Sequence, residues 1–168
     1  NIWGLQDPML FDEALIMLDT LKDRQPFNLT LLTVNSHPPG YEYSGCPVYM
    51  SGNTLLNGIH RTDYALGRFV KEIEQMEIYE NTVVVIVGDH VMFKSVANSE
   101  LFKNVPASWY GRTYLSIRTP DVTVDHPRNI FGITPDLAPT ILDLLGFRDM
   151  DFISGKSLIS ERSKYQRI

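Results

Sequence analysis

The chain of 168 residues has one cysteine, no long apolar run and more acidic than basic side chains. Cys46 has no second thiol with which to form an internal disulfide, so cysteine usage leaves the redox compartment open. The most apolar stretches, Leu29–Val34 and Val83–Val87, are far shorter than the roughly 20 residues that cross a bilayer. The net charge of -5 disfavours a nucleic-acid partner, because phosphate binding needs concentrated positive charge.

Several motifs are also missing. The sequence has no G-x-x-x-x-G-K loop, no G-x-G-x-x-G fingerprint, no paired C-x-x-C and no G-x-S-x-G elbow, which argues against P-loop and Rossmann nucleotide sites, zinc ribbons and serine hydrolases. A hydrophobic content of 43% with 21% charged residues is that of a soluble globular domain, and we expect one domain over residues 1–168. The chain begins at Asn1 without a leader, so we expect it to be cut from a longer polypeptide.

Strand and helix patterns alternate, which predicts an α/β fold with a mostly parallel sheet and helices on both faces. The periodicity of apolar residues predicts helices over Pro8–Asp23, Thr54–Ile78 and Thr134–Gly146. In the last of these, Thr134 is expected to cap the helix. Runs rich in β-branched residues predict strands over Leu29–Val34, Thr82–Val87 and Thr113–Arg118. The stretch Ser36–Asn53, rich in proline and glycine, is predicted to be a long functional loop.

Two residues with metal-ligand chemistry follow the strongest predicted strand, which ends in Gly88-Asp89-His90. In open α/β sheets, ligands bind outside the carboxyl ends of strands. A carboxylate beside an imidazole suits manganese or zinc, and magnesium is an alternative. The competing interpretation is structural, with Asp89 capping the next turn and His90 packing against the sheet.

A second histidine, His37, follows the predicted strand Leu29–Val34 in the segment Ser36-His37-Pro38-Pro39. Imidazole titrates near neutral pH and is able to bind an anionic oxygen or relay a proton. The alternative is a histidine that only hydrogen-bonds the loop backbone. If the two strands are parallel neighbours, His37 and the Asp89-His90 pair meet in one crevice.

Weaker candidates lie elsewhere in the chain. His60 and Asp63 are three residues apart on a predicted helix, where an exposed ion pair is favoured over metal ligation. His126 is a candidate late metal ligand. Lys94 and Ser95 are candidate phosphate contacts, although a solvated loop is the default interpretation.

Ordered blocks of the sequence resemble the lipoteichoic acid synthase and phosphoglycerol transferase family of the sulfatase and alkaline phosphatase superfamily. The resemblance covers roughly Trp3 to Phe147. The matching blocks are Trp3-Gly4-Leu5 with Asp7, Leu10-Phe11-Asp12, Ser36–Pro39, Leu56-Asn57 through Thr62–Gly67, Gly88-Asp89-His90 and Thr134–Gly146. The resemblance implies an alkaline-phosphatase-like fold with a mostly parallel sheet, of which this chain is the C-terminal portion.

Carried over residue by residue, the resemblance implies that Asp89 and His90 are ligands of a catalytic Mn²⁺ or Mg²⁺ ion. It implies that His37 contacts the phosphoglycerol group. The family's threonine nucleophile and a glutamate ligand would lie in the upstream part of the same polypeptide, so this chain by itself is expected to be inactive.

The resemblance also implies a two-step transfer of glycerol phosphate through a covalent intermediate. The donor would be phosphatidylglycerol and the acceptor a glycan or a glycerol-phosphate polymer. The location would be the extracytoplasmic side of a membrane-anchored cell-envelope protein. The loop with Pro38-Pro39-Gly40-Tyr41 and Cys46-Pro47 is more similar to the periplasmic-glucan transferases, although the second cysteine common in that branch is absent.

Two other functions remain alternatives. A sulfatase shares the fold and the metal ligands, but Cys46-Pro47-Val48 does not match the C-x-P-x-R motif from which sulfatases make their nucleophile. The other alternative is a binding or regulatory lobe in which Asp89 and His90 serve only the structure.

Overall fold

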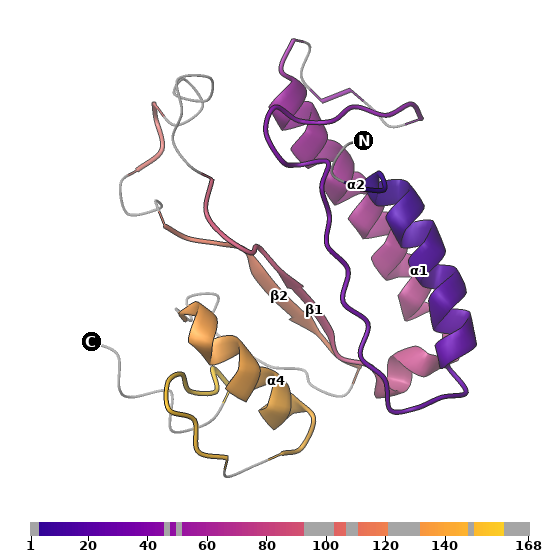
Figure 1. Ribbon diagram of the computed structural model, residues 1–168, viewed down its shortest axis with the longest axis vertical. Helices are drawn as coiled ribbons and strands as arrows, with labels where there is room; N and C mark the ends of the chain where they lie inside the picture. The colour runs from indigo at the N-terminus through magenta and orange to yellow at the C-terminus, as the bar shows by residue number, and fades with distance from the viewer. Residues whose placement is uncertain are drawn as a thin grey trace. The chain divides into compact units, whose positions relative to one another are not determined.

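The computed structural model describes residues 4–45, 48–49, 52–92, 103–106, 111–120, 132–147 and 150–159. The chain divides into two compact units, Asn1–Tyr79 and Glu80–Ile168, and each is described here by itself (Figure 1). The described helices and strands are, in order, α1 (Asp7–Leu21), α2 (Thr54–Glu74), η1 (Glu77–Asn81), β1 (Val84–Val87), β2 (Leu115–Arg118), η4 (Thr134–Asp136) and α4 (Leu137–Leu144). None of the helices within these ranges combines the length and the apolar character that crossing a membrane requires.

The first unit is built on two packed helices, α1 (Asp7–Leu21) and α2 (Thr54–Glu74), which lie side by side (Figure 1). Phe11 of α1 stacks on Phe69 of α2 with ring centroids 4.8 Å apart. Each large apolar side chain buried in this way contributes about 1.5–3 kcal/mol. The buried apolar residues are Phe11, Ala14, Leu18, Leu55, Ala65, Phe69, Val70, Ile73 and Ile78.

Both helices start where the sequence predicts, but α2 ends earlier. Asn53 caps α2 by accepting a hydrogen bond from the N–H of Leu56 at 2.9 Å. The helix ends at Glu74, and a 3₁₀ helix, η1 (Glu77–Asn81), follows it. Ile78 is buried in η1, so the apolar periodicity continues beyond the end of the α-helix.

The segment Leu29–Val34 is not a strand in the described part of the chain. It has no hydrogen-bonded partner strand there, and Leu32 is 70% exposed. The prediction of a strand buried on both faces is therefore wrong for this segment as it stands in the structure. A strand requires a neighbour to satisfy its N–H and C=O groups, and a run of β-branched residues does not supply one.

The second unit contains a two-stranded sheet formed by β1 (Val84–Val87) and β2 (Leu115–Arg118). The strands are antiparallel, with Val84 opposite Arg118 and Val87 opposite Leu115. Both strands were predicted, but their orientation differs from the parallel arrangement expected. Parallel neighbours need a crossover, usually a helix, and the described stretches 103–106 and 111–114 of the connection contain no helix.

The helix predicted near Thr134 begins with a 3₁₀ turn, η4 (Thr134–Asp136), which leads into α4 (Leu137–Leu144). The predicted cap is wrong by one position. Ile133 occupies the N-cap, and its N–H donates to Oδ2 of Asp136 at 2.8 Å. Gly146, with φ of 85°, follows the helix end as predicted.

The segment 150–159 contacts η4 and α4 through part-buried hydrogen bonds. The N–H of Lys156 donates to Oδ1 of Asp136 at 2.9 Å, and the N–H of Leu158 donates to Oγ1 of Thr140 at 2.9 Å. Asp136 and Thr140 are fully buried. Asp136 therefore joins the start of the helix to a segment twenty residues further along the chain.

Candidate functional site

Asp89 and His90 lie directly after β1, at the position expected for a ligand-binding pair. Their side chains are 69% and 57% exposed, so His90 does not pack against the sheet. Oδ1 of Asp89 accepts a hydrogen bond from the N–H of His90 at 2.8 Å, which fixes the carboxylate relative to the backbone. The N–H of Gly88 donates to the carbonyl of Tyr114 at 2.9 Å and extends the ladder by one bond, so the pair projects from a fixed strand end.

The donor chemistry of this pair fits part of a divalent-cation site. Nδ1 of His90 lies 2.8 Å from the carbonyl oxygen of Val91. A carbonyl oxygen only accepts, so Nδ1 carries the proton and the lone pair of the neutral ring lies on Nε2. Nε2 is 3.6 Å from Oδ2 of Asp89. Two ligands about 2.1 Å from one ion are about 3.4 Å apart in tetrahedral geometry and about 3.0 Å apart in the octahedral geometry of Mg²⁺ or Mn²⁺, so the two side chains would have to move slightly closer together to share one ion.

The pair is not a complete metal centre. Within the ranges that the structure describes, no group of three or more His, Cys, Asp or Glu side chains is arranged to hold a metal ion.

His37 lies in a tight turn after the extended segment Leu29–Val34. Its N–H donates to the carbonyl of Val34 at 3.1 Å, and its carbonyl accepts from the N–H of Gly40 at 2.8 Å. The imidazole is exposed, and Nδ1 lies 2.8 Å from the carbonyl oxygen of Pro38. By the same reasoning as for His90, Nδ1 carries the proton and the lone pair of the neutral ring lies on Nε2.

A buried carboxylate supports the beginning of this turn. Asp7, in the first turn of α1, is fully buried, and its Oδ1 accepts hydrogen bonds from the N–H of Val34 at 2.8 Å and of Asn35 at 3.2 Å. Its Oδ2 accepts from Oγ1 of Thr62 on α2 at 2.5 Å. Asn35, also fully buried, returns a contact by accepting from the N–H of Asp7 at 3.0 Å. We name Asp7, Asn35 and Thr62 the Asp7 junction.

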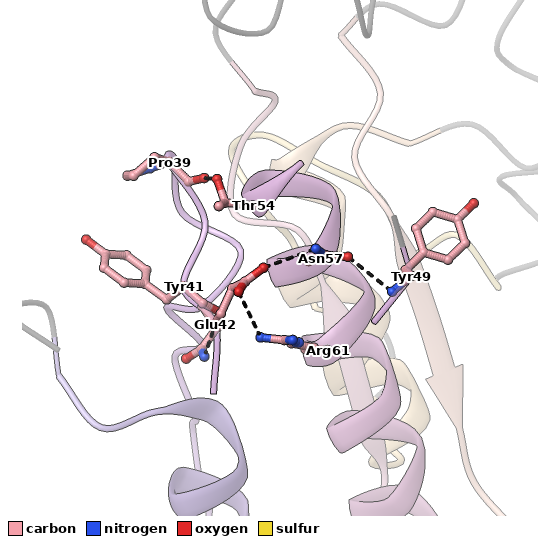
Figure 2. Close-up of polar contacts among 8 residues, drawn as sticks. Pro39, Tyr41, Glu42, Tyr49, Thr54, Asn57 and Arg61 are labelled. Atoms are coloured by element: carbon pink, nitrogen blue, oxygen red, sulfur yellow. Dashed lines mark hydrogen bonds and ion pairs between the residues drawn. The ribbon is translucent and has the colours of Figure 1, made fainter. Parts of the chain in front are cut away.

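A second polar cluster holds the following loop against α2 (Figure 2). Asn57 donates from Nδ2 to Glu42 at 3.0 Å and accepts from the N–H of Tyr49 at 3.1 Å. Arg61, whose side chain is 6% exposed, lies with Nη1 3.8 Å from the carboxylate of Glu42 and with its guanidinium over the ring of Tyr43. Nε and Nη1 of Arg61 are buried and have no hydrogen-bond partner among the residues that the structure describes, so this permanent charge is incompletely compensated there.

The weaker candidates from the sequence receive little support. His60 stacks on Tyr49 with ring centroids 4.8 Å apart. No ion pair joins His60 to Asp63 in the described part of α2, so the expected pairing is wrong. His126, Lys94, Ser95 and Cys46 lie outside the described residues.

His37 belongs to the first compact unit, and Asp89 and His90 belong to the second. The convergence of the three side chains on a common crevice stays a prediction.

A family model described as Sulfatase matches residues 2–147. The chain belongs to the sulfatase family. Phosphoglycerol transferase I of Xanthomonas campestris is 31% identical over 171 residues, which cover 95% of this chain and 23% of that protein. Lipoteichoic acid synthase 1 of Bacillus subtilis is 29% identical over 178 residues, which cover 94% of this chain and 27% of that protein. These names confirm the resemblance noted from the sequence blocks.

A solved structure of an alkaline phosphatase superfamily protein from Vibrio parahaemolyticus matches with a TM-score of 0.70 and 24% identity. The match covers 87% of this chain and 35% of that chain. It shows that this sulfatase-family chain has the fold of that superfamily. The chain spans about a quarter of the length of the curated relatives, 23% for the phosphoglycerol transferase.

The sequence analysis assigned no role to the Asp7 junction or to Arg61. Asp7 and Thr62 were noted only as members of the sequence blocks that resemble the phosphoglycerol transferase family. Asp7 immediately precedes Pro8 at the start of a helix, which is a signal for a helix N-terminus and not for a contact with residues 34 and 35. The burial of Arg61 has a weak sequence signal, because it lies four residues before Ala65 and eight before Phe69 on the apolar face of α2.

Proposed function

We propose that this chain supplies part of the active site of a phosphoglycerol transferase, which moves glycerol phosphate from phosphatidylglycerol to a glycan or a glycerol-phosphate polymer. Asp89 and His90 would hold Mn²⁺ or Mg²⁺ together with ligands from elsewhere in the same polypeptide. The proposal includes a cell-envelope protein with an extracytoplasmic catalytic domain. The names of the relatives support the reaction class.

The observation that carries the proposal is the geometry of the Asp89-His90 pair. A hard carboxylate oxygen and the unprotonated nitrogen of a neutral imidazole are 3.6 Å apart at a strand end. A divalent ion bound there would neutralise charge on phosphoryl oxygens and lower the pKa of a coordinated hydroxyl group.

This chain's own residues would bind and orient the substrate phosphate. The carbonyl of Pro38 holds the ring of His37 through Nδ1, so Nε2 is the atom that faces substrate in this proposal. When protonated, His37 would donate from Nε2 to a phosphoryl oxygen, and a charge-assisted hydrogen bond of this kind is about twice as strong as a neutral one. The nucleophile that attacks phosphorus would come from the upstream part of the polypeptide.

Sulfate-ester hydrolysis is the second candidate, because the matching family model carries the name Sulfatase. A sulfate monoester and a phosphodiester each present anionic oxygens to the same metal and imidazole. The two reactions must therefore be distinguished by testing which of the two substrates is consumed.

The first test is a Mn²⁺ titration of the 168-residue chain, read by thermal unfolding. Binding to the folded state stabilises by RT ln(1 + [L]/Kd), or about 2.7 kcal/mol at one hundred times Kd. Two protein donors bind a divalent ion weakly, so the titration extends to millimolar Mn²⁺. We expect stabilisation in the wild type and in the matched control Asp151→Asn, another exposed aspartate of the second unit. We expect none in Asp89→Asn.

The second test measures turnover by the polypeptide that carries this chain, with phosphatidylglycerol vesicles and an aryl sulfate offered separately. Release of diacylglycerol that falls by about two orders of magnitude or more in His90→Gln supports phosphoglycerol transfer. Aryl-sulfate hydrolysis without diacylglycerol release favours the sulfatase. A folded chain with neither metal binding nor turnover would be a non-catalytic lobe. Turnover by the 168-residue chain alone would contradict a nucleophile supplied from upstream.

A further inference from the structure

We propose that the Asp7 junction positions His37, so that Asp7, Asn35 and Thr62 are positioning residues for the imidazole. The proposal rests on the proposed function, in which His37 contacts the substrate phosphate. Its basis is that three segments contact one another at the buried Asp7 carboxylate. They are the start of α1, the residues before the His37 turn and the middle of α2.

The junction fixes the chain immediately before His37. The carboxylate of Asp7 accepts from the N–H groups of Val34 and Asn35, the third and second residues before the histidine. These two N–H groups have no strand partner in the described chain, so the carboxylate replaces the ladder that the segment lacks. The bond from Thr62 then ties the same carboxylate to α2.

The junction also fixes the chain immediately after the turn. The side-chain amide of Asn35 donates to the carbonyl of Tyr41 at 3.4 Å, and the N–H of Tyr41 donates to the carbonyl of Asn35 at 3.0 Å. Residues 35 and 41 are thereby paired across the turn. His37 lies between residues 35 and 41, which are hydrogen-bonded to each other. Its own N–H and C=O are hydrogen-bonded to Val34 and Gly40.

This arrangement matters for chemistry because a binding or catalytic side chain must be held within about 0.5 Å of its productive position. An exposed imidazole on a proline-containing loop does not reach that precision by packing, since little protein surrounds it. The precision has to come from the backbone beneath it. Here the backbone is anchored by two fully buried side chains, Asp7 and Asn35.

The experiment measures the His37 ring itself in the full 168-residue chain without ligand. Long-range ¹H–¹⁵N NMR spectra recorded at about pH 9, above the usual imidazole titration range, report which ring nitrogen carries the proton. The variants are Asp7→Asn, which weakens the acceptor, and Thr62→Val, which removes the hydroxyl that contacts Asp7 and the Gly58 carbonyl with little change in volume. Thr62→Ser keeps the hydroxyl and is the conservative variant. Asp136→Asn is the matched control, because Asp136 is an equally buried carboxylate in the other unit.

We expect the fraction of the Nδ1–H form of His37 to fall by about two-fold or more in Asp7→Asn and Thr62→Val, because the turn then samples other conformations. We expect wild-type spectra of His37 in Thr62→Ser and Asp136→Asn. If Asp7→Asn does not fold, the comparison of Thr62→Val with Thr62→Ser decides the question.

Two results would overturn the proposal. One is a lowered melting temperature in Thr62→Val with unchanged His37 spectra, which would make the junction purely structural. The other is an equal change of the His37 spectra in Asp136→Asn. Neither result depends on turnover, so a failure of the positioning role is distinguishable from a failure of the proposed transferase activity.

Discussion

A methyl group added at Gly58 tests whether the His37 turn rests directly on α2. A Cβ atom at this position would lie 2.6 Å from the carbonyl oxygen of Asn35 and 3.2 Å from the N atom of Tyr41. These are backbone atoms, so no flexible side chain is able to move aside. An ordinary carbon to oxygen contact is about 3.3 Å or longer, so the Asn35 carbonyl would have to move by about 0.7 Å.

The same helix offers a matched control at Gly67, where an added Cβ has nothing within 4 Å. Alanine is favoured over glycine inside a helix by about 0.5–1 kcal/mol. Gly67→Ala should therefore raise the free energy of unfolding by about that amount. Gly58→Ala gains the same helix propensity but incurs an overpacking cost of about 1–3 kcal/mol, so its net effect should be a loss of up to about 2.5 kcal/mol.

The assay is urea unfolding followed by circular dichroism at 222 nm, which reports mainly on α1 and α2, the longest described helices. The two variants should differ by about 2 kcal/mol, which exceeds the uncertainty of most extrapolations. If Gly58→Ala is as stabilising as Gly67→Ala, the turn does not contact α2 as described. The contact with α2 would then no longer count among the interactions that hold the His37 turn in place.

Three further predictions concern other parts of the chain. Arg61→Met should leave the free energy of unfolding unchanged or raise it by about 1 kcal/mol in urea unfolding, because a buried charge, two of whose nitrogen atoms have no hydrogen-bond partner among the described residues, is replaced by an apolar side chain of similar length. Gly155→Ala should destabilise the fold by about 3 kcal/mol in the same assay, since the added Cβ would collide with the backbone carbonyl of Pro135. Gly146→Ala is the control: Gly146 also has a positive φ but lies in open space, so the substitution should cost only about 1 kcal/mol. The hydrogen bond and charge of Asp19 raise the pKa of Lys22 above its usual value of 10.5. The stability that this pair contributes is therefore present below pH 10.5 and is lost as the pH rises through the folded-state pKa. NMR titration should show a lower pKa of Lys22 in Asp19→Asn.

The helices could be predicted from sequence because their signals are local. Apolar spacing located α1 and α2, and Gly146 marked the end of α4. The error at the end of α2 has a specific cause. Ile78 continues the apolar pattern, but it is a buried residue of η1 and not of α2. Apolar periodicity alone does not distinguish an α-helix from a 3₁₀ helix that follows it.

Strand pairing could not be predicted in the same way, because it depends on residues distant in sequence. β1 and β2 were located correctly, but their antiparallel pairing was not predicted. Leu29–Val34 has the composition of a strand but no partner in the described chain. Its last N–H groups instead bond to Asp7, which lies 27 residues from Val34. No local pattern at either position indicates this contact.

The three aspartates at element boundaries show why sequence alone does not separate structural from functional carboxylates. Asp7 and Asp136 are fully buried and accept backbone N–H groups from segments distant in the chain, so their oxygens serve the fold. Asp89 follows a strand, is mostly exposed, and accepts from the N–H of its neighbour His90, with its second oxygen directed toward the imidazole. A fold gains little from holding an exposed carboxylate beside an imidazole at that spacing, since exposed pairs contribute about 0–1 kcal/mol. The pair therefore adds little to stability, and the metal titration of Asp89→Asn tests the proposal that its two side chains share a cation.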